Sequence, residues 1–182
     1  MAFLTALVRG IERVSEVTGR FVAWLALAMV LVQFVVVAMR YVFGLSVLAM
    51  QESIWYMHSI IFLVAAGYTL LHNAHVRVDV LYGNVDRKKK ALIDLGGVLV
   101  ILLPMCIATV WLSWDYVLNA WRVREGSVEV SGIPAVYLLK TCIWLFAGTL
   151  ALQGVALGVR SAFILAGNES TFEPVEEKEP AL

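Results

Sequence analysis

Charged residues are scarce in this chain of 182 residues. Aspartate, glutamate, lysine and arginine together make up 15% of the sequence, whereas soluble domains contain about 25%. Hydrophobic residues account for 61%, and the mean hydropathy is +0.84. The shortage of charge argues against an ordinary soluble domain and indicates an integral membrane protein.

The chain also lacks a net charge and has few cysteines. Its 14 basic residues balance 14 acidic ones, which gives no reason to expect a nucleic-acid partner. The two cysteines, Cys106 and Cys142, lie inside apolar stretches and lack the CxxC spacing of a redox pair or a zinc site. We therefore interpret them as buried residues without a chemical role.

Four apolar runs are each long enough to cross a bilayer as a helix. They cover residues 21–39, 53–71, 95–114 and 136–159, and a helix needs about 20 apolar residues to cross a hydrocarbon core about 30 Å thick. The first run is too long for a signal peptide, whose apolar segment has about 7 to 15 residues. Pro104 predicts a local kink in the third run. The predicted fold is an all-α integral membrane protein with four transmembrane helices in one domain, residues 21–160.

The lysines and arginines predict the orientation of these helices. Ten of them lie on the side that holds the N-terminus, residues 72–94 and the C-terminus, and four lie on the opposite side. Basic residues concentrate on the cytoplasmic side of membrane proteins, so we expect both termini in the cytoplasm. The four on the outer side are Arg40, Arg122, Arg124 and Lys140. Eight aromatic residues gather around the two outer connections, namely Tyr41, Trp55, Tyr56, Trp111, Trp114, Tyr116, Trp121 and Tyr137.

The two ends of the chain differ in character. Residues 1–20 are predicted to form an amphipathic helix with apolar and charged residues on opposite faces. Such a helix either lies in the cytoplasmic interface or prolongs the first span against a partner, and the sequence leaves both arrangements open. The apolar face consists of Phe3, Leu4, Leu7, Val8, Ile11 and Val14. Residues 168–182 contain five glutamates and two prolines and are predicted to be a disordered, solvated tail.

The three histidines are the obvious candidates for binding a cofactor or a metal. His58 lies in the second run, whereas a haem held between helices usually needs ligands from two spans. His72, His75 and Asp79 are spaced like half of a metal site, but no second cluster completes it. We therefore expect no cofactor, no metal and no catalytic site.

Ionisable groups inside the membrane are the usual sign of a transport pathway, and they are few here. His58 is expected one turn from the outer end of its span, and Asp115 and Lys140 are expected at outer helix ends. No internal repeat is visible, and carriers often contain one. The chain is therefore not expected to transport a solute alone. In the fourth run, Gly154 and Gly158 form a GxxxG pattern that favours close helix packing.

Three short motifs stand next to the spans. The first contains Arg40, Tyr41, Val42, Phe43, Gly44 and Ser46, and Glu52 follows it. The second is the pair Gly67 and Tyr68, and the third runs from His75 through Arg77 to Asp79. Together with the four-span layout, these motifs resemble the small Q subunit (DctQ-like) of tripartite ATP-independent periplasmic (TRAP) transporters. The resemblance covers roughly residues 20–160, but Ala49, Met50 and Gln51 stand where that family often has a tryptophan.

The resemblance implies a division of labour among three proteins. A periplasmic binding protein captures a small organic acid, often a carboxylate, and a large many-span permease subunit imports it with a sodium gradient. The small subunit carries no substrate. It embraces the large subunit and helps to present a docking surface for the binding protein. The resemblance places the chain in the inner membrane of a bacterium or archaeon.

The motif residues are expected to be structural or to contact other subunits. Arg40 and Glu52 either pair across the first outer loop or contact a partner. His75, Arg77 and Asp79 are expected in a polar network with another subunit or with lipid headgroups. Asp86 is expected to cap a helix that begins with a basic, headgroup-facing turn of Arg87, Lys88, Lys89 and Lys90.

Two other functions remain open at this point. The chain has the size and layout of a membrane-anchor subunit of a respiratory oxidoreductase, which would purify with haem or quinone. It is also small enough to be a self-sufficient carrier, which would transport its solute alone in liposomes.

Overall fold

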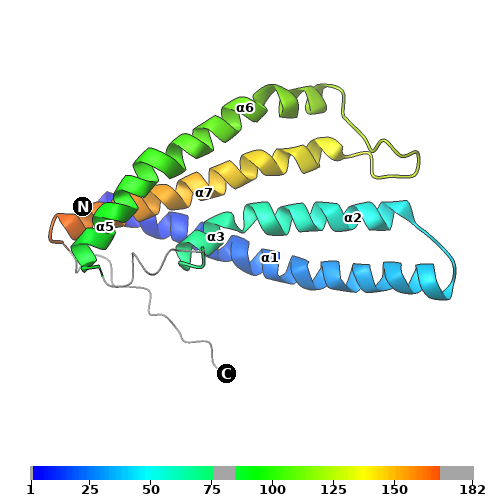
Figure 1. Ribbon diagram of the computed structural model, residues 1–182, viewed down its shortest axis with the longest axis horizontal. Helices are drawn as coiled ribbons and strands as arrows, with labels where there is room; N and C mark the ends of the chain where they lie inside the picture. Colours follow the sequence, from blue (N-terminus) through cyan, green and yellow to red (C-terminus); the bar gives the residue numbers. More distant parts are fainter. Residues whose placement is uncertain (1, 76–84, 169–182) are drawn as a thin grey trace.

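The computed structural model describes residues 2–75 and 85–168, and the regular structure in these ranges is helical. The helices form four rods (Figure 1). The rods are α1 (Ala2–Val42); α2 (Leu48–Ser59), η1 (Ile60–Val64) and α3 (Ala66–Leu71); α5 (Arg87–Gly97), η2 (Val98–Leu102) and α6 (Leu103–Arg122); and α7 (Val136–Leu165). The short segments η1 and η2 are π-helical.

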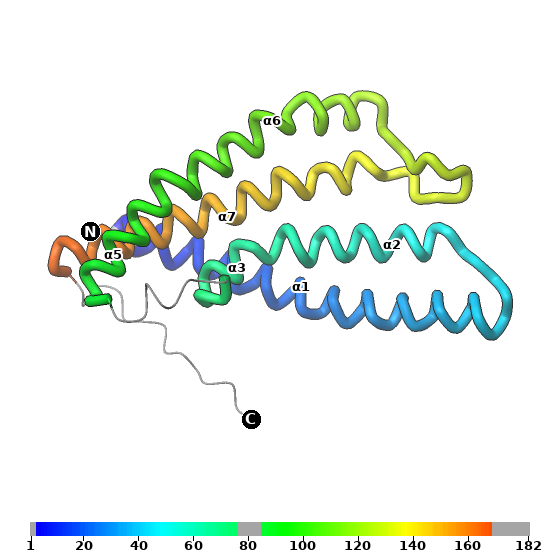
Figure 2. Tube along the Cα trace, in the orientation of Figure 1, coloured from blue at the N-terminus to red at the C-terminus, as the bar shows by residue number. Residues whose placement is uncertain are grey.

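All four rods are long and apolar enough to cross a membrane. The prediction of an all-α protein with four transmembrane helices is therefore confirmed for the described part of the chain. The connections 43–47 and 123–135 lie at one end of the bundle, and the start of α1 and the end of α7 lie at the other (Figure 2). We call the end with these two connections the outer end, following the predicted orientation, and the opposite end the inner end.

The first rod includes the N-terminal residues. α1 continues through 41 residues without a break, so residues 2–20 form one helix with the first span. The position of the membrane surface along α1 and a contact with a partner stay predictions. Val8 is fully buried, but Phe3 and Val14 of the same predicted apolar face are 78% and 57% exposed. The inner half of α1 instead packs through Val8, Ser15 and Val22, which recur every seven residues and are buried.

The second and third rods each contain a π-helical turn. Pro104 has no N–H to donate to the carbonyl four residues earlier, and η2 lies just before it. The predicted local distortion thus takes the form of a π-helical segment. The sequence gives no comparable signal for η1, because Ile60–Val64 contains neither proline nor glycine.

The ends of the rods extend beyond the predicted spans. α7 continues to Leu165, and the third rod begins at Arg87, because a helix keeps its backbone hydrogen bonds after the apolar run has ended. Asp86 stands at the N-cap position of α5, as expected, but its side chain makes no capping hydrogen bond. The expected capping interaction is therefore wrong, although the helix boundary is right. The predicted tail at 168–182 lies outside the described residues, apart from residue 168.

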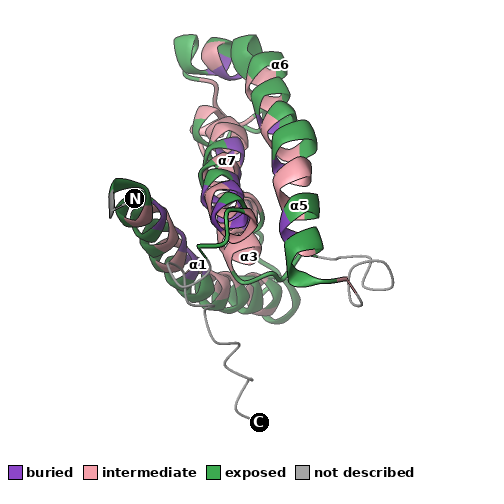
Figure 3. Cartoon of the chain, turned by 90° about the vertical axis from the view of Figure 1, so that its left-hand side faces the viewer, coloured by how far each residue is buried: buried purple, intermediate pink, exposed green. Residues whose placement is uncertain are grey.

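The central element is α7, which contacts each of the other three rods. Viewed towards the inner end, it lies between α1 and α5, and buried residues gather along it (Figure 3). In its most apolar stretch 39% of the residues are buried, compared with 6% in α1. Small residues make this possible, because a helix without bulky side chains lets its neighbours approach closely. The buried small residues of α7 are Cys142, Ala147, Gly154, Ala156, Gly158 and Ser161.

The GxxxG pair faces the third rod. A Cβ atom added to Gly154 would lie 2.5 Å from Leu102 Cδ2, and one added to Gly158 would lie 3.4 Å from Val98 Cγ1. Cys106 packs nearby in the core with Ala66 and Ala147. Both cysteines are buried and form no disulfide, as their apolar surroundings predicted.

Gly67 offers the sharpest test of this packing. A Cβ atom there would lie 2.8 Å from the Thr149 carbonyl oxygen, which is backbone and cannot move aside alone. We expect Gly67→Ala to lower the free energy of unfolding by about 1–3 kcal/mol. Gly148→Ala is the matched control, because nothing lies within 4 Å of its added Cβ atom. The control should be neutral or up to about 1 kcal/mol more stable, since alanine favours helix. Thermal unfolding of both variants in detergent measures the difference, and equal melting temperatures would contradict the packing.

Candidate subunit interface

The first motif forms the turn that ends α1. Gly44 has φ +65°, a conformation that favours glycine, and the N–H groups of Phe43 and Leu45 both donate to the Met39 carbonyl. Ser46 Oγ accepts a hydrogen bond of 2.9 Å from Gln51 Nε2. Gly44 and Ser46 therefore shape the connection between α1 and α2.

The same motif also leaves large side chains on the surface. Tyr41 is 81% exposed and Phe43 is 69% exposed. Arg40 is exposed at the outer end of α1 and makes no ion pair with a described residue. These three side chains are available to a neighbouring subunit.

Glu52 binds the connection 123–135 and not Arg40. Its side chain is buried, with a relative exposure of 6%, and its carboxylate accepts hydrogen bonds from the Ser127 hydroxyl and, at 2.6 Å, from the Ile133 backbone N–H. The Arg40–Glu52 pair is therefore wrong, because both Glu52 oxygens are occupied by the connection 123–135. A contact between Arg40 and another subunit stays a prediction.

The connection 123–135, which we call the outer hairpin, is held in shape by its own hydrogen bonds. Ser127 N–H donates to the Ile133 carbonyl at 3.2 Å, and Gly132 N–H donates to the Glu129 carbonyl at 3.0 Å. A Cβ atom at Gly132 would lie 2.5 Å from Glu52 Oε1, so this position has no room for a side chain. Glu52 thus anchors the outer hairpin to α2.

The tip of the outer hairpin is apolar and fully exposed. Val128 and Val130 have relative exposures of 100% and 107%. Two exposed valines so close in sequence are unusual on a loop that hydrogen bonds hold in place. The tip is therefore a candidate contact surface.

A second anchor joins the two ends of the outer hairpin. Lys140 Nζ lies 2.5 Å from Glu125 Oε2 and 3.9 Å from the centre of the Tyr116 ring. The Lys140 side chain is only 14% exposed. Lys140 of α7 is thus tied to the start of the outer hairpin by an ion pair and to α6 by a cation–π contact.

Aromatic residues support this outer end, in the place predicted for them. Trp114 and Trp144 stack with ring centres 5.0 Å apart, and Trp121 packs edge-on against Tyr137 at 4.7 Å. Both pairs join α6 to α7. Indole N–H groups find partners as well, since Trp121 Nε1 donates to Thr141 Oγ1 at 2.9 Å and Trp144 Nε1 donates to Ser113 Oγ at 3.1 Å. Such aromatic belts are typical of a membrane–water boundary.

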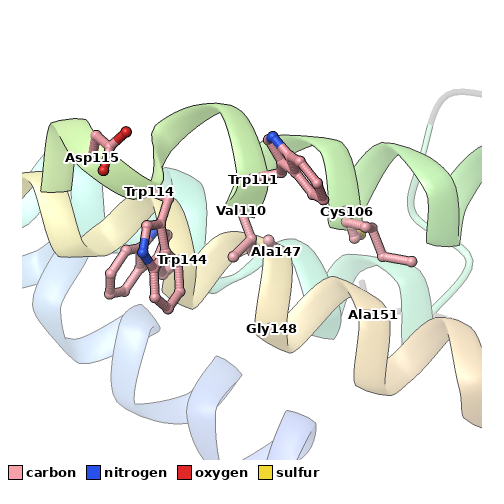
Figure 4. A pocket seen from close by; sticks show the side chains of 10 residues that line it. Cys106, Val110, Trp111, Trp114, Asp115, Trp144, Ala147, Gly148 and Ala151 are labelled. Atoms are coloured by element: carbon pink, nitrogen blue, oxygen red, sulfur yellow. The ribbon is translucent and has the colours of Figure 1, made fainter. Parts of the chain in front are cut away.

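A groove of about 640 Å³ opens between α6 and α7 below these rings (Figure 4). Of the ten residues that line it, Asp115 alone carries a charge, and the others are mostly apolar or aromatic. The lining residues include no histidine, lysine or serine that would form an acid–base pair with Asp115 or with the Cys106 thiol. The groove is therefore suited to an apolar occupant.

The inner end has its own polar cluster, which the sequence did not reveal. Glu16 lies 2.9 Å from His72 Nε2 and accepts a hydrogen bond of 3.1 Å from Arg20 Nε. The His72 ring packs on Tyr68 with centres 4.4 Å apart, and Tyr68 in turn lies over Gly19. His72 thus contacts α1, and the second motif, Gly67 and Tyr68, serves the packing of α3.

The third motif is only partly visible. His75 is exposed just after α3, and Arg77 and Asp79 lie outside the described residues. Among the described residues, no group of three histidine, cysteine, aspartate or glutamate side chains is placed to hold a metal ion. The polar network expected for His75, Arg77 and Asp79 stays a prediction.

Two polar contacts between α1 and α7 were also missed. Arg160 Nη2 lies 2.5 Å from Glu12 Oε1, and Ser15 Oγ donates to Gln153 Oε1 at 3.0 Å in a buried position. Glu12 and Ser15 stand three apart and so share a face of α1, but other charged residues, among them Arg9, Arg13 and Glu16, surround them, so the sequence carries no distinctive signal for this seam.

The anchor at Glu52 makes a direct prediction for the outer hairpin. Glu52→Ala removes two hydrogen bonds to a charged group, and such bonds contribute about 1.5–3 kcal/mol each. We expect the amide of Ile133 to exchange its hydrogen about tenfold faster or more in this variant. Glu129→Ala is the matched control, because its side chain is exposed at the hairpin tip and it leaves Glu52 in place. Hydrogen exchange measured by mass spectrometry over 123–135 compares the two, and unchanged exchange in Glu52→Ala would show that the carboxylate does not hold the hairpin.

Most of the chain matches a known protein family. A family model described as "Tripartite ATP-independent periplasmic transporters, DctQ component" matches residues 29–163. The match begins inside α1 and ends inside α7, so it includes the outer hairpin and both of its anchors. No match was found among curated proteins, and none among solved structures.

Proposed function

Because the chain belongs to the DctQ component family of tripartite ATP-independent periplasmic transporters, we propose that it is the small, non-transporting membrane subunit of such an importer. The family is one of transporter components and not of enzymes. Its tripartite character implies two partners, a large many-span permease subunit and a periplasmic binding protein. In this proposal the chain is a scaffold for the first and part of the docking surface for the second.

The observation that carries the scaffold role is the distribution of acidic residues. No aspartate or glutamate occurs within residues 21–39, 53–71, 95–114 or 136–159. Ion-coupled carriers place such groups near the middle of the membrane, often beside broken helices. The acidic residues of the rods instead serve as ties at their ends, as Glu12, Glu16 and Glu52 do.

The outer end supports the docking role. The outer hairpin is fixed at Glu52 and Lys140, and it exposes the apolar tip of Val128 and Val130. A fixed loop loses little conformational entropy when a protein binds to it, which favours binding. We assign the binding protein to this surface and the large subunit to the membrane-embedded sides of the bundle.

The inner end is assigned to the cytoplasm with both termini. Its basic residues, among them the turn Arg87–Lys90, follow the distribution expected for cytoplasmic loops and would meet lipid headgroups there. The host membrane is the inner membrane of a bacterium or archaeon. The imported solute is a small organic acid, often a carboxylate in this class of transporter, and import is driven by a sodium gradient.

The family assignment gives no support to a membrane anchor of a respiratory oxidoreductase. The two functions separate in one measurement, because an anchor purifies with haem or quinone and an oxidoreductase. A Soret band in the purified protein would contradict the transporter role. Solute uptake by this chain alone in liposomes would contradict the scaffold role.

Arg40 tests the scaffold role within the assembled transporter. We expect Arg40→Ala to reduce solute uptake about five- to tenfold by weakening assembly, since loss of a well-placed interface residue costs more than about 1 kcal/mol. Co-purification of the large subunit should fall in parallel. Arg13→Ala, at an exposed position near the inner end of α1, is the control and should leave both unchanged. If uptake failed while the complex stayed intact, Arg40 would have a role in transport and not in assembly.

The hairpin tip tests the docking role. Val128→Asp combined with Val130→Asp should weaken binding of the binding protein to the purified membrane complex about tenfold or more, because an apolar contact is replaced by two charges. Glu129→Gln, between the two valines, is the matched control and should change the affinity little. Binding measured on complexes in lipid nanodiscs decides, and an unchanged affinity in the double variant would place docking elsewhere.

A further inference from the structure

Gln33 occupies an unexpected place in the first rod. It lies in the middle of an apolar stretch of α1, yet its side chain is exposed on the surface of the bundle and forms no hydrogen bond with a described residue. Its exposed neighbours along the helix, Val30, Phe34 and Val37, are apolar. An amide group is thus presented to the surroundings of a membrane-embedded helix.

The depth of Gln33 makes this costly. It stands six residues before the end of the apolar run at Met39, which is about 9 Å at a helical rise of about 1.5 Å per residue. Gln33 therefore lies well inside a hydrocarbon core about 30 Å thick. A glutamine side chain is too short to reach the headgroups from there. Burying an unpaired amide in hydrocarbon costs several kcal/mol, and lipid tails offer it no hydrogen bond.

His58 is a second exposed polar side chain within an apolar stretch, on the second rod. It is exposed, and its ring stacks on Phe62 with centres 6.2 Å apart. It stands ten residues after the start of α2 at Leu48, but only five residues, about 8 Å, after the start of the apolar run at Ser53. The helix thus begins before the apolar run does, and the expectation that His58 lies one turn from the outer end of its span stays a prediction. Gln33 and His58 stand six and five residues from the outer ends of their apolar runs, so they lie at about the same depth.

Gln153, unlike Gln33, has a hydrogen-bond partner within the bundle. Gln153 of α7 is buried and accepts a hydrogen bond from Ser15 of α1 at 3.0 Å. Glu12 with Arg160 likewise links two rods, and Glu52 links the second rod to the outer hairpin. Polar groups inside a membrane protein act as such links between helices, and Gln33 and His58 have the chemistry for one without a hydrogen-bond partner among the described residues.

We propose that the outer half of the α1–α2 pair is the surface that binds the large permease subunit, and that Gln33 and His58 form hydrogen bonds with polar side chains on its transmembrane helices. This inference rests on the proposed function, which supplies the large subunit as a partner. The occupant must be a protein helix, because the headgroups are too far away and the lipid tails have no polar atoms. α1 leaves room for it, since only 6% of its most apolar stretch is buried within the chain.

Photocrosslinking in the membrane locates this surface. The chain is expressed with the large subunit and the binding protein, and benzoylphenylalanine is introduced in place of Gln33, His58 or Leu31. Leu31 is the matched control, because it is 57% exposed at nearly the same depth but about 160° around the helix from Gln33. Irradiation should join the large subunit to positions 33 and 58 and not to position 31. An adduct between two copies of this chain, or equal yields at positions 31 and 33, would overturn the proposal.

Substitution then tests the hydrogen bonds. Gln33→Leu and His58→Leu should each weaken association with the large subunit about three- to tenfold, which corresponds to the strength of hydrogen bonds between membrane helices. Gln33→Asn keeps an amide and should retain more of the association than Gln33→Leu. Leu31→Ala should have no effect. Helicity and melting temperature of each isolated variant should stay at wild-type values, because these side chains have no hydrogen bond within the described chain.

The outcomes distinguish a failure of this inference from a failure of the proposed function. If the wild-type chain binds the large subunit but Gln33→Leu and His58→Leu bind equally well and positions 33 and 58 give no adduct, the inference is wrong and the function stands. If the wild-type chain does not bind the large subunit, both are wrong.

Discussion

The bundle depends on the close approach of α7 to the other three rods. Lipid tails are as apolar as leucine side chains, so the helices are held together by tight packing and by polar links and not by escape from water. Small residues such as Ala147, Gly154 and Ser161 provide the first, and the contacts of α7 with Ser15 and Glu12 of α1 provide the second. A bulky residue at Gly154 or Gly158 would push α7 away from the third rod.

This arrangement produces a rigid frame with two fixed ends. Glu52 and Lys140 hold the outer hairpin, and Glu16 holds His72 at the inner end. The four apolar runs 21–39, 53–71, 95–114 and 136–159 contain no aspartate or glutamate that would bind a coupling ion. A frame of this kind suits a subunit that positions other subunits. Two exposed groups are available for contacts with partners, namely the amide of Gln33 and the apolar tip of the outer hairpin.

The sequence predicted what depends on local composition. Long apolar runs gave the four spans, Pro104 marked a helix distortion, Gly154 and Gly158 marked a close helix contact, and the aromatic residues marked the end that holds the two connections. It did not predict what depends on residues far apart in the chain. Glu52 was considered as a partner of Arg40, 12 residues away, whereas it binds Ser127 and Ile133, because the buried carboxylate requires donors that only the folded hairpin supplies. The start of α2 was placed at Ser53 because Gln51 and Glu52 interrupt the apolar run, whereas the helix begins at Leu48.

The central claim is that this chain supports a transporter without forming its pathway. The most direct measurement is a cryo-electron microscopy structure of the assembled transporter in a lipid nanodisc with its substrate bound. The account predicts that the substrate lies wholly within the large subunit, and that the outer half of α1 and α2 packs against that subunit with Gln33 inside the contact. A substrate bound among the helices of this chain, or an α1 surrounded by lipid on every exposed side, would contradict it.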